Sequence, residues 1–146
     1  MSTFEDHLAT LHTAAVDASN GYAEAFKAAD GKGLSSLFAE LQRLHDRHAS
    51  ELAQMLTKRG RTADKDGSFM SLVHETIMDV RGLVGGLGES VLPGLIDGEK
   101  RNIAKYDDAL KEPGAAQDEP VLGRQRGELA AVVDRMSAMH QAAPKG

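Results

Sequence analysis

The sequence predicts an all-α protein, built as an antiparallel four-helix bundle with a shorter helix in a long crossover. Apolar residues recur every three or four positions through four long segments, which is the spacing of one buried helix face. No segment alternates apolar and polar residues as a half-buried strand would. Short breaks join the first segment to the second and the third to the fourth, so each pair should pack antiparallel.

The first two helices are expected over residues 4–29 and 34–59. Thr3 and Asp6 resemble a capping box at the start of the first helix. Gly60 is expected to stop the second helix by adopting a left-handed conformation. The buried face of the first helix should comprise Phe4, Leu8, Leu11, Ala15, Ala18, Tyr22, Ala25 and Phe26.

The other two long helices are expected over residues 89–111 and 119–139, with Pro93 in the first turn of the earlier one. A shorter helix at about 68–84 should lie in the connection between the two hairpins. One long crossover of this kind is the topology of ferritin-like folds. The tail from about residue 141 is expected to fray.

The length of 146 residues fits a single domain, residues 1–146, with a core of its own. The net charge of −5 and the lack of a basic cluster argue against a nucleic acid as partner. The chain has no cysteine, which excludes disulfides and thiolate metal sites. Its start is acidic and lacks the apolar run of a signal peptide or membrane anchor, so we expect a cytoplasmic, bacterial-type protein without membrane contact.

Each long helix places at least one polar residue within its apolar face. These residues are Tyr22, His45, His48, Glu99, Tyr106 and Gln125. A carboxylate in an apolar interior is costly unless it is hydrogen-bonded or paired. We therefore expect a buried polar cluster, in which His48 donates to Glu99 and an amide or tyrosine hydroxyl completes the set.

A metal site is the alternative interpretation of the same residues. One divalent ion (iron, zinc or manganese) would be bound by His45, His48 and Glu99, with Glu51 and Glu128 as reserve ligands. A di-iron carboxylate bundle needs Glu on two helices and Glu-x-x-His on the other two, and this chain lacks most of that set. A complete dinuclear centre is therefore not expected. A small-ligand pocket and pH sensing by the paired histidines are further alternatives.

Short motifs in a consistent order run from about Leu8 to Met139. They are Gly21-Tyr22, His48-Ala49-Ser50-Glu51-Leu52, Gly60, Gly67-Ser68, His74, Gly98-Glu99, Tyr106 with Ala109-Leu110, and Val121-Leu122 with Gln125. Through them the chain resembles the ferritin-like superfamily, and within it a small bacterial family of four-helix bundles described only as a domain of unknown function. The resemblance implies the fold and no assigned activity. The usual ferritin ligands are mostly absent, which argues against iron storage and ferroxidase activity.

Taken together, the sequence favours a protein that is not an enzyme. The expected role is association with a second copy, as a homodimer, or with another protein, around a core whose metal site is degraded. The alternative role is metal binding through His45, His48 and Glu99.

Overall fold

The computed structural model describes residues 3–31, 33–61 and 91–142. These ranges contain the long helices α1 (Phe4–Ala29), α2 (Ser35–Lys58), α4 (Leu92–Leu110) and α5 (Glu119–Ala142), and the short 3-10 helix η2 (Pro113–Gln117). Within the same ranges there is no β-strand. The all-α class and the four long helices are therefore confirmed for the described part of the chain. The shorter helix expected at about 68–84 lies outside the described residues.

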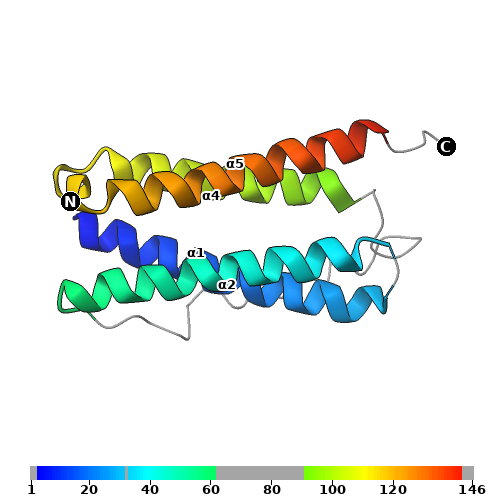
Figure 1. The fold of residues 1–146 in the computed structure, drawn as a ribbon, viewed down its shortest axis with the longest axis horizontal. Coiled ribbons are helices and arrows are strands. Elements are labelled where there is room, and N and C mark those ends of the chain that lie inside the picture. The colour runs from blue at the N-terminus through cyan, green and yellow to red at the C-terminus, as the bar shows by residue number, and fades with distance from the viewer. Residues whose placement is uncertain (1–2, 32, 62–90, 143–146) are drawn as a thin grey trace.

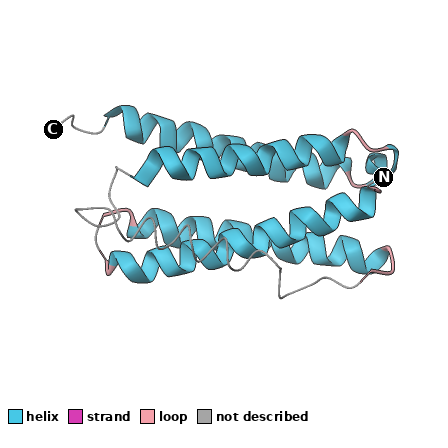
Figure 2. Ribbon diagram, turned by 180° about the vertical axis from the view of Figure 1, so that it is seen from behind, coloured by secondary structure: helices cyan, strands magenta, loops and turns pink. Residues whose placement is uncertain are grey.

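The four long helices lie side by side as two hairpins, α1 with α2 and α4 with α5 (Figures 1 and 2). Close packing also joins α1 to α4. The colour ramp of Figure 1 shows that α1 and α2 run in opposite directions, as do α4 and α5. The end of α2 and the start of α4 lie at opposite ends of the bundle, so these two helices run in the same direction.

Two predicted helix ends are confirmed in atomic detail. At the start of α1, the Thr3 hydroxyl accepts from the Asp6 N–H at 3.2 Å, and the Asp6 carboxylate accepts from the Thr3 N–H at 3.0 Å. This is a complete capping box. At the end of α2, Gly60 has a φ of 79°, and the N–H groups of Gly60 and Arg61 donate to carbonyls of the last turn. This pattern is a Schellman motif, which favours glycine at that position.

Some sequence-based expectations were wrong. Phe26 is 44% exposed, although its spacing placed it on the buried face of α1. It lies about 100° around the helix from Ala25, at the edge of that face. Helix α5 extends to Ala142, three residues beyond the expected end at 139, and the rest of the expected tail lies outside the described residues. The turn before it contains the unexpected η2, which Pro113 begins and which buries Ala115.

Among the described residues, buried apolar side chains form two clusters along the bundle. One contains Phe38, Leu41, Leu92, Ile96 and Met136, and the other contains Leu8, Leu52, Leu56, Leu122 and Leu129. On α2, His45 and His48 fall in the chain between members of the two clusters. None of the described helices combines the length and the hydrophobicity that a membrane-spanning segment needs.

Candidate functional site

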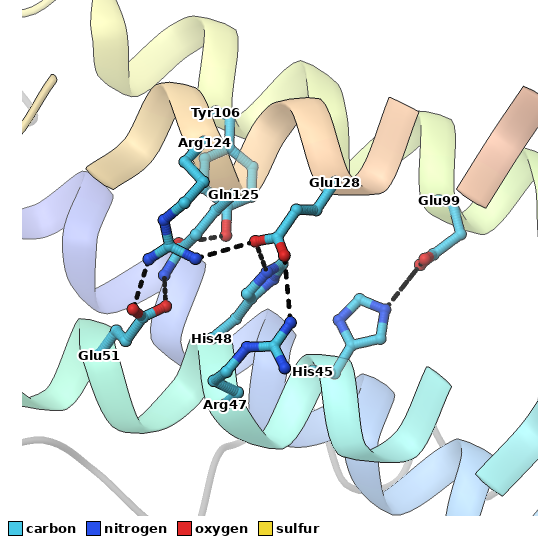
Figure 3. Close-up of polar contacts among 9 residues, drawn as sticks. All are labelled: His45, Arg47, His48, Glu51, Glu99, Tyr106, Arg124, Gln125 and Glu128. Carbon is cyan, nitrogen blue, oxygen red and sulfur yellow. Dashed lines mark hydrogen bonds and ion pairs between the residues drawn. The ribbon is translucent and has the colours of Figure 1, made fainter. Parts of the chain in front are cut away.

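The polar residues that the sequence places on apolar faces are all buried. Their exposed fractions do not exceed 7%, the value for Tyr22, and they are Tyr22, His45, His48, Glu99, Tyr106 and Gln125. They come from all four long helices. The reserve ligands Glu51 and Glu128 are half-buried instead, each with a side chain 30% exposed. The structure separates these residues into two hydrogen-bonded groups that meet at the histidines (Figure 3).

The first group is centred on a buried pair between α2 and α4. His45 Nε2 lies 2.9 Å from one carboxylate oxygen of Glu99 and 3.1 Å from the other. The amide of Asn102 donates to the same carboxylate at 3.4 Å. On the other side, the ring of Tyr22 stacks on the His45 ring, with centroids 5.6 Å apart and planes 14° apart. Burial raises the pKa of Tyr22 well above its usual value, and the negative charge of Glu99 adds to that rise.

His48 bonds to a different helix. Its Nε2 lies 3.1 Å from Oε1 of Glu128 on α5, so the expected hydrogen bond from His48 to Glu99 was wrong. A step of three residues turns a helix by about 300°, which directs the His45 and His48 rings to different neighbours. Their centroids are 6.0 Å apart and their planes nearly perpendicular. The other ring nitrogen of His48, Nδ1, is buried and has no hydrogen-bond partner among the described residues.

Burial is the main cause that lowers the pKa of His48 below its usual value. Nearby His45 lowers it further, whereas the hydrogen bond to Glu128 and the charges of Glu128 and Glu51 act in the opposite direction. The neutral imidazole is therefore the favoured form near neutral pH. A neutral ring that donates from Nε2 to Glu128 leaves Nδ1 as a bare acceptor, in agreement with its lack of a partner.

The second group extends from His48 along α2 and α5. Glu128 accepts from Arg124 Nη1 and from Arg47 Nη2, both at 3.0 Å. Arg124 also donates to Glu51, so one guanidinium connects carboxylates of two helices. Figure 3 shows these side chains converging between the two ribbons. Each carboxylate oxygen of Glu128 therefore has a cationic donor.

The inner end of this group is a buried amide. Gln125 Nε2 donates to Glu51 at 3.0 Å, and Gln125 Oε1 accepts from the Tyr106 hydroxyl at 2.7 Å. Burial is the main cause that raises the pKa of Tyr106, and the carboxylates of Glu51, Glu99 and Glu128 raise it further. The phenol is therefore held in its neutral, donating form.

Ion pairs link α2 to α5 at several points along the two helices. We call this set of ion pairs the α2–α5 seam: Glu40–Arg135, Arg47–Glu128 and Glu51–Arg124. Arg59, just after α2, and Asp118, just before α5, form a further pair at the end of the seam. Sequence reasoning did not identify the arginines of the seam. The available signal was the spacing of the charged residues. Positions 40, 47 and 51 on α2 are separated by the same steps as positions 135, 128 and 124 on α5, and the facing residues carry opposite charges.

The candidate metal ligands do not converge. His45 and His48 bond to two different carboxylates, on α4 and on α5. Within residues 3–31, 33–61 and 91–142, no group of three or more His, Asp or Glu side chains is arranged to hold a metal ion. In this arrangement each imidazole is bonded to a separate carboxylate, and metal binding by His45, His48 and Glu99 stays a prediction.

The sequence profile of a family described as Domain of unknown function (DUF2383) matches residues 3–112. The chain belongs to this family. No curated protein and no solved structure matches the chain. The DUF2383 match covers α1, α2 and α4, and so includes Tyr22, His45, His48 and Glu99. Helix α5, which supplies Arg124, Gln125 and Glu128, lies beyond the matched residues.

Proposed function

We propose that this DUF2383 protein is a non-catalytic, ferritin-like bundle that acts by associating with a second copy of itself. Its core polar residues would maintain the structure instead of supporting metal chemistry. The observation that carries this proposal is the pairing of the histidines. His45 is bonded to Glu99 and His48 to Glu128, so each imidazole already has a carboxylate partner of its own.

The ferritin-like part of the proposal is supported by the directions of the helices. Helices α1 and α2 are opposed, α2 and α4 run the same way, and α4 and α5 are opposed again (Figure 1). Two hairpins joined by a single long crossover produce this order of directions, and ferritin-like folds have one such crossover.

The metal part of the proposal is tested by elemental analysis. Protein purified without a His-tag is incubated in turn with iron, zinc and manganese, and is then freed of unbound ions. We expect no stoichiometric metal, because the imidazoles and carboxylates of the core are engaged with one another. One tightly held ion per chain would overturn the proposal.

The association part is supported by Phe26, the large apolar residue that the described part of the chain leaves exposed. Burial in an interface with a second copy would remove this side chain from water. Sedimentation is expected to show a dimer, and Phe26→Glu is expected to shift it toward monomer without a change in helix content. A strict monomer at all concentrations would overturn the dimer.

Metal binding by His45, His48 and Glu99 is the second candidate function. The observation that favours it is the bare, buried Nδ1 of His48, which lies on a ring 6.0 Å from the His45 ring. Binding through Nδ1 would leave the hydrogen bond from His48 Nε2 to Glu128 in place, so it predicts that bound Zn²⁺ is lost in His45→Ala and retained in Glu128→Gln. Equal loss in both variants would contradict this ligand set.

A further inference from the structure

Arg124 holds together two carboxylates that belong to different helices. Its Nη2 donates to Glu51 on α2, and its Nη1 donates to Glu128 on α5 at 3.0 Å (Figure 3). The Glu128 oxygen that accepts from Arg124 also lies 3.1 Å from the imidazole of His48. One positive group thus sits between two carboxylates, beside a buried imidazole.

Without the Arg124 guanidinium, Glu51, Glu128 and His48 make up a chemically reasonable set of metal ligands, with Arg47 still bonded to the other oxygen of Glu128. Two carboxylates and an imidazole suit Mn²⁺, Fe²⁺ and Zn²⁺. His48 and Glu51 are three residues apart on α2, so they share a face of that helix, and Glu128 reaches them from α5. This set differs from the one of the second candidate function, because Glu51 and Glu128 replace His45 and Glu99.

The state of His48 is compatible with that role. Its side chain is only 1% exposed, and its Nδ1 has no hydrogen-bond partner among the described residues. For metal binding, the single proton of the neutral imidazole would move from Nε2 to Nδ1, so that the lone pair of Nε2 is directed toward the position of Glu128.

Two features of Arg124 oppose the binding of a cation here. Its charge and that of Arg47 balance the charges of Glu51 and Glu128, so no negative charge is left over. The guanidinium of Arg124 also holds the carboxylates of Glu51 and Glu128 at hydrogen-bond distance from its nitrogens. Metal–oxygen bonds of about 2.0–2.2 Å would require these two carboxylates to approach each other. Glutamate side chains have the rotational freedom for that approach once the guanidinium is absent.

We infer that Arg124 stands in the place of a divalent cation, and that Glu51, Glu128 and His48 form a latent cation site that Arg124 closes. The inference rests on the proposed function, because it assumes that the wild-type chain carries no resident metal. It predicts which single residue keeps the chain metal-free.

The test compares wild-type protein with Arg124→Ser and Arg135→Ser, each titrated with Mn²⁺ and followed by electron paramagnetic resonance. Arg135 is the matched control, since it also joins α5 to α2 through a carboxylate, Glu40, with the side chains of both residues about half exposed. We expect one Mn²⁺ per chain in Arg124→Ser and none in the wild type or Arg135→Ser. Saturating Mn²⁺ should raise the melting temperature of Arg124→Ser by on the order of 5–10 °C.

Two further variants make the result decisive. Arg124→Gln removes the charge but retains an amide, and it serves if Arg124→Ser does not fold. His48→Ala in the Arg124→Ser background should abolish Mn²⁺ binding, because it removes the imidazole ligand. The inference is overturned if folded Arg124→Ser and Arg124→Gln bind no Mn²⁺, or if binding persists without His48. Stoichiometric metal in the wild type would overturn the proposed function instead.

Discussion

The buried pair of His45 and Glu99 should contribute far more to stability than a similar pair at the surface. Their side chains are 2% and 3% exposed, and the closest nitrogen–oxygen distance is 2.9 Å. Glu99→Leu keeps most of the volume but leaves the imidazole of His45 without its acceptor. Removing one member of a buried pair costs about 3–5 kcal/mol, because the other is left unpaired in a medium that solvates it poorly.

The chain contains a matched control for this prediction. His7 and Glu112 are also a histidine–glutamate pair, 3.2 Å apart, but their side chains are 22% and 29% exposed. Water can replace either partner there, so Glu112→Leu should cost less than about 1 kcal/mol. Comparing the two variants separates the effect of burial from the effect of losing a glutamate.

Urea unfolding followed by circular dichroism provides the assay. For a chain of this size, a loss of 3–5 kcal/mol lowers the urea midpoint by roughly 2 M, whereas the control should shift it by about 0.5 M or less. If Glu99→Leu does not fold, Glu99→Gln replaces it with a smaller expected loss. The double variant His45→Phe/Glu99→Leu should recover most of the stability, since Phe can keep the stacking on Tyr22. Equal midpoints for the Glu99→Leu and Glu112→Leu variants would refute the reasoning.

The remaining predictions concern His48, the tyrosines and one glycine. Burial lowers the pKa of His48 from its usual 6.5, so the unfolded chain takes up that proton more readily than the folded chain. The free energy of unfolding should therefore fall as the pH drops below about 6.5, and His48→Gln should reduce that fall. Urea unfolding at about pH 7.5 and 5.5 measures it, and an identical fall in both proteins would contradict this. Tyr22 and Tyr106 are the only tyrosines in a chain without tryptophan, and burial raises the pKa of both. Ultraviolet absorbance should therefore show no tyrosinate in the folded protein at about pH 10, where an exposed tyrosine is half ionised. Gly60→Ala should cost about 1 kcal/mol because its φ is 79°, whereas Gly94→Ala, a helical position with free space, should be neutral or slightly stabilising in thermal unfolding.

Much of the fold can be derived from the sequence because helix periodicity and capping are local. The range 4–29 matches α1 residue for residue, and the Thr3–Asp6 capping box and the Gly60 stop require only neighbours in the chain. Phe26 shows the limit of that reasoning. Periodicity defines a buried face only to within about one residue's turn, and a residue at its edge can lie on either side of the boundary.

In the candidate site, too, the local sequence predicts which residues are buried but not which residues they contact. That His45, His48, Glu99 and Gln125 face the core follows from their positions on apolar stripes. Which groups they meet depends on how neighbouring helices are rotated, and no local pattern states this. His48 was expected at Glu99 and instead contacts Glu128, a half-buried residue outside the apolar stripe of α5.

The α2–α5 seam has a consequence for which alignments of the two helices are available. Each of its exposed ion pairs adds little stability alone. Sliding α5 along α2 by one helical turn, however, would bring Arg47 opposite Arg124 in one direction and Glu51 opposite Glu128 in the other. A slide of two turns also brings like charges together, with Arg47 opposite Arg135 in one direction and Glu40 opposite Glu128 in the other. Repulsion between like charges thus penalises these neighbouring alignments, and three modest contacts favour one alignment of the two hairpins over its neighbours.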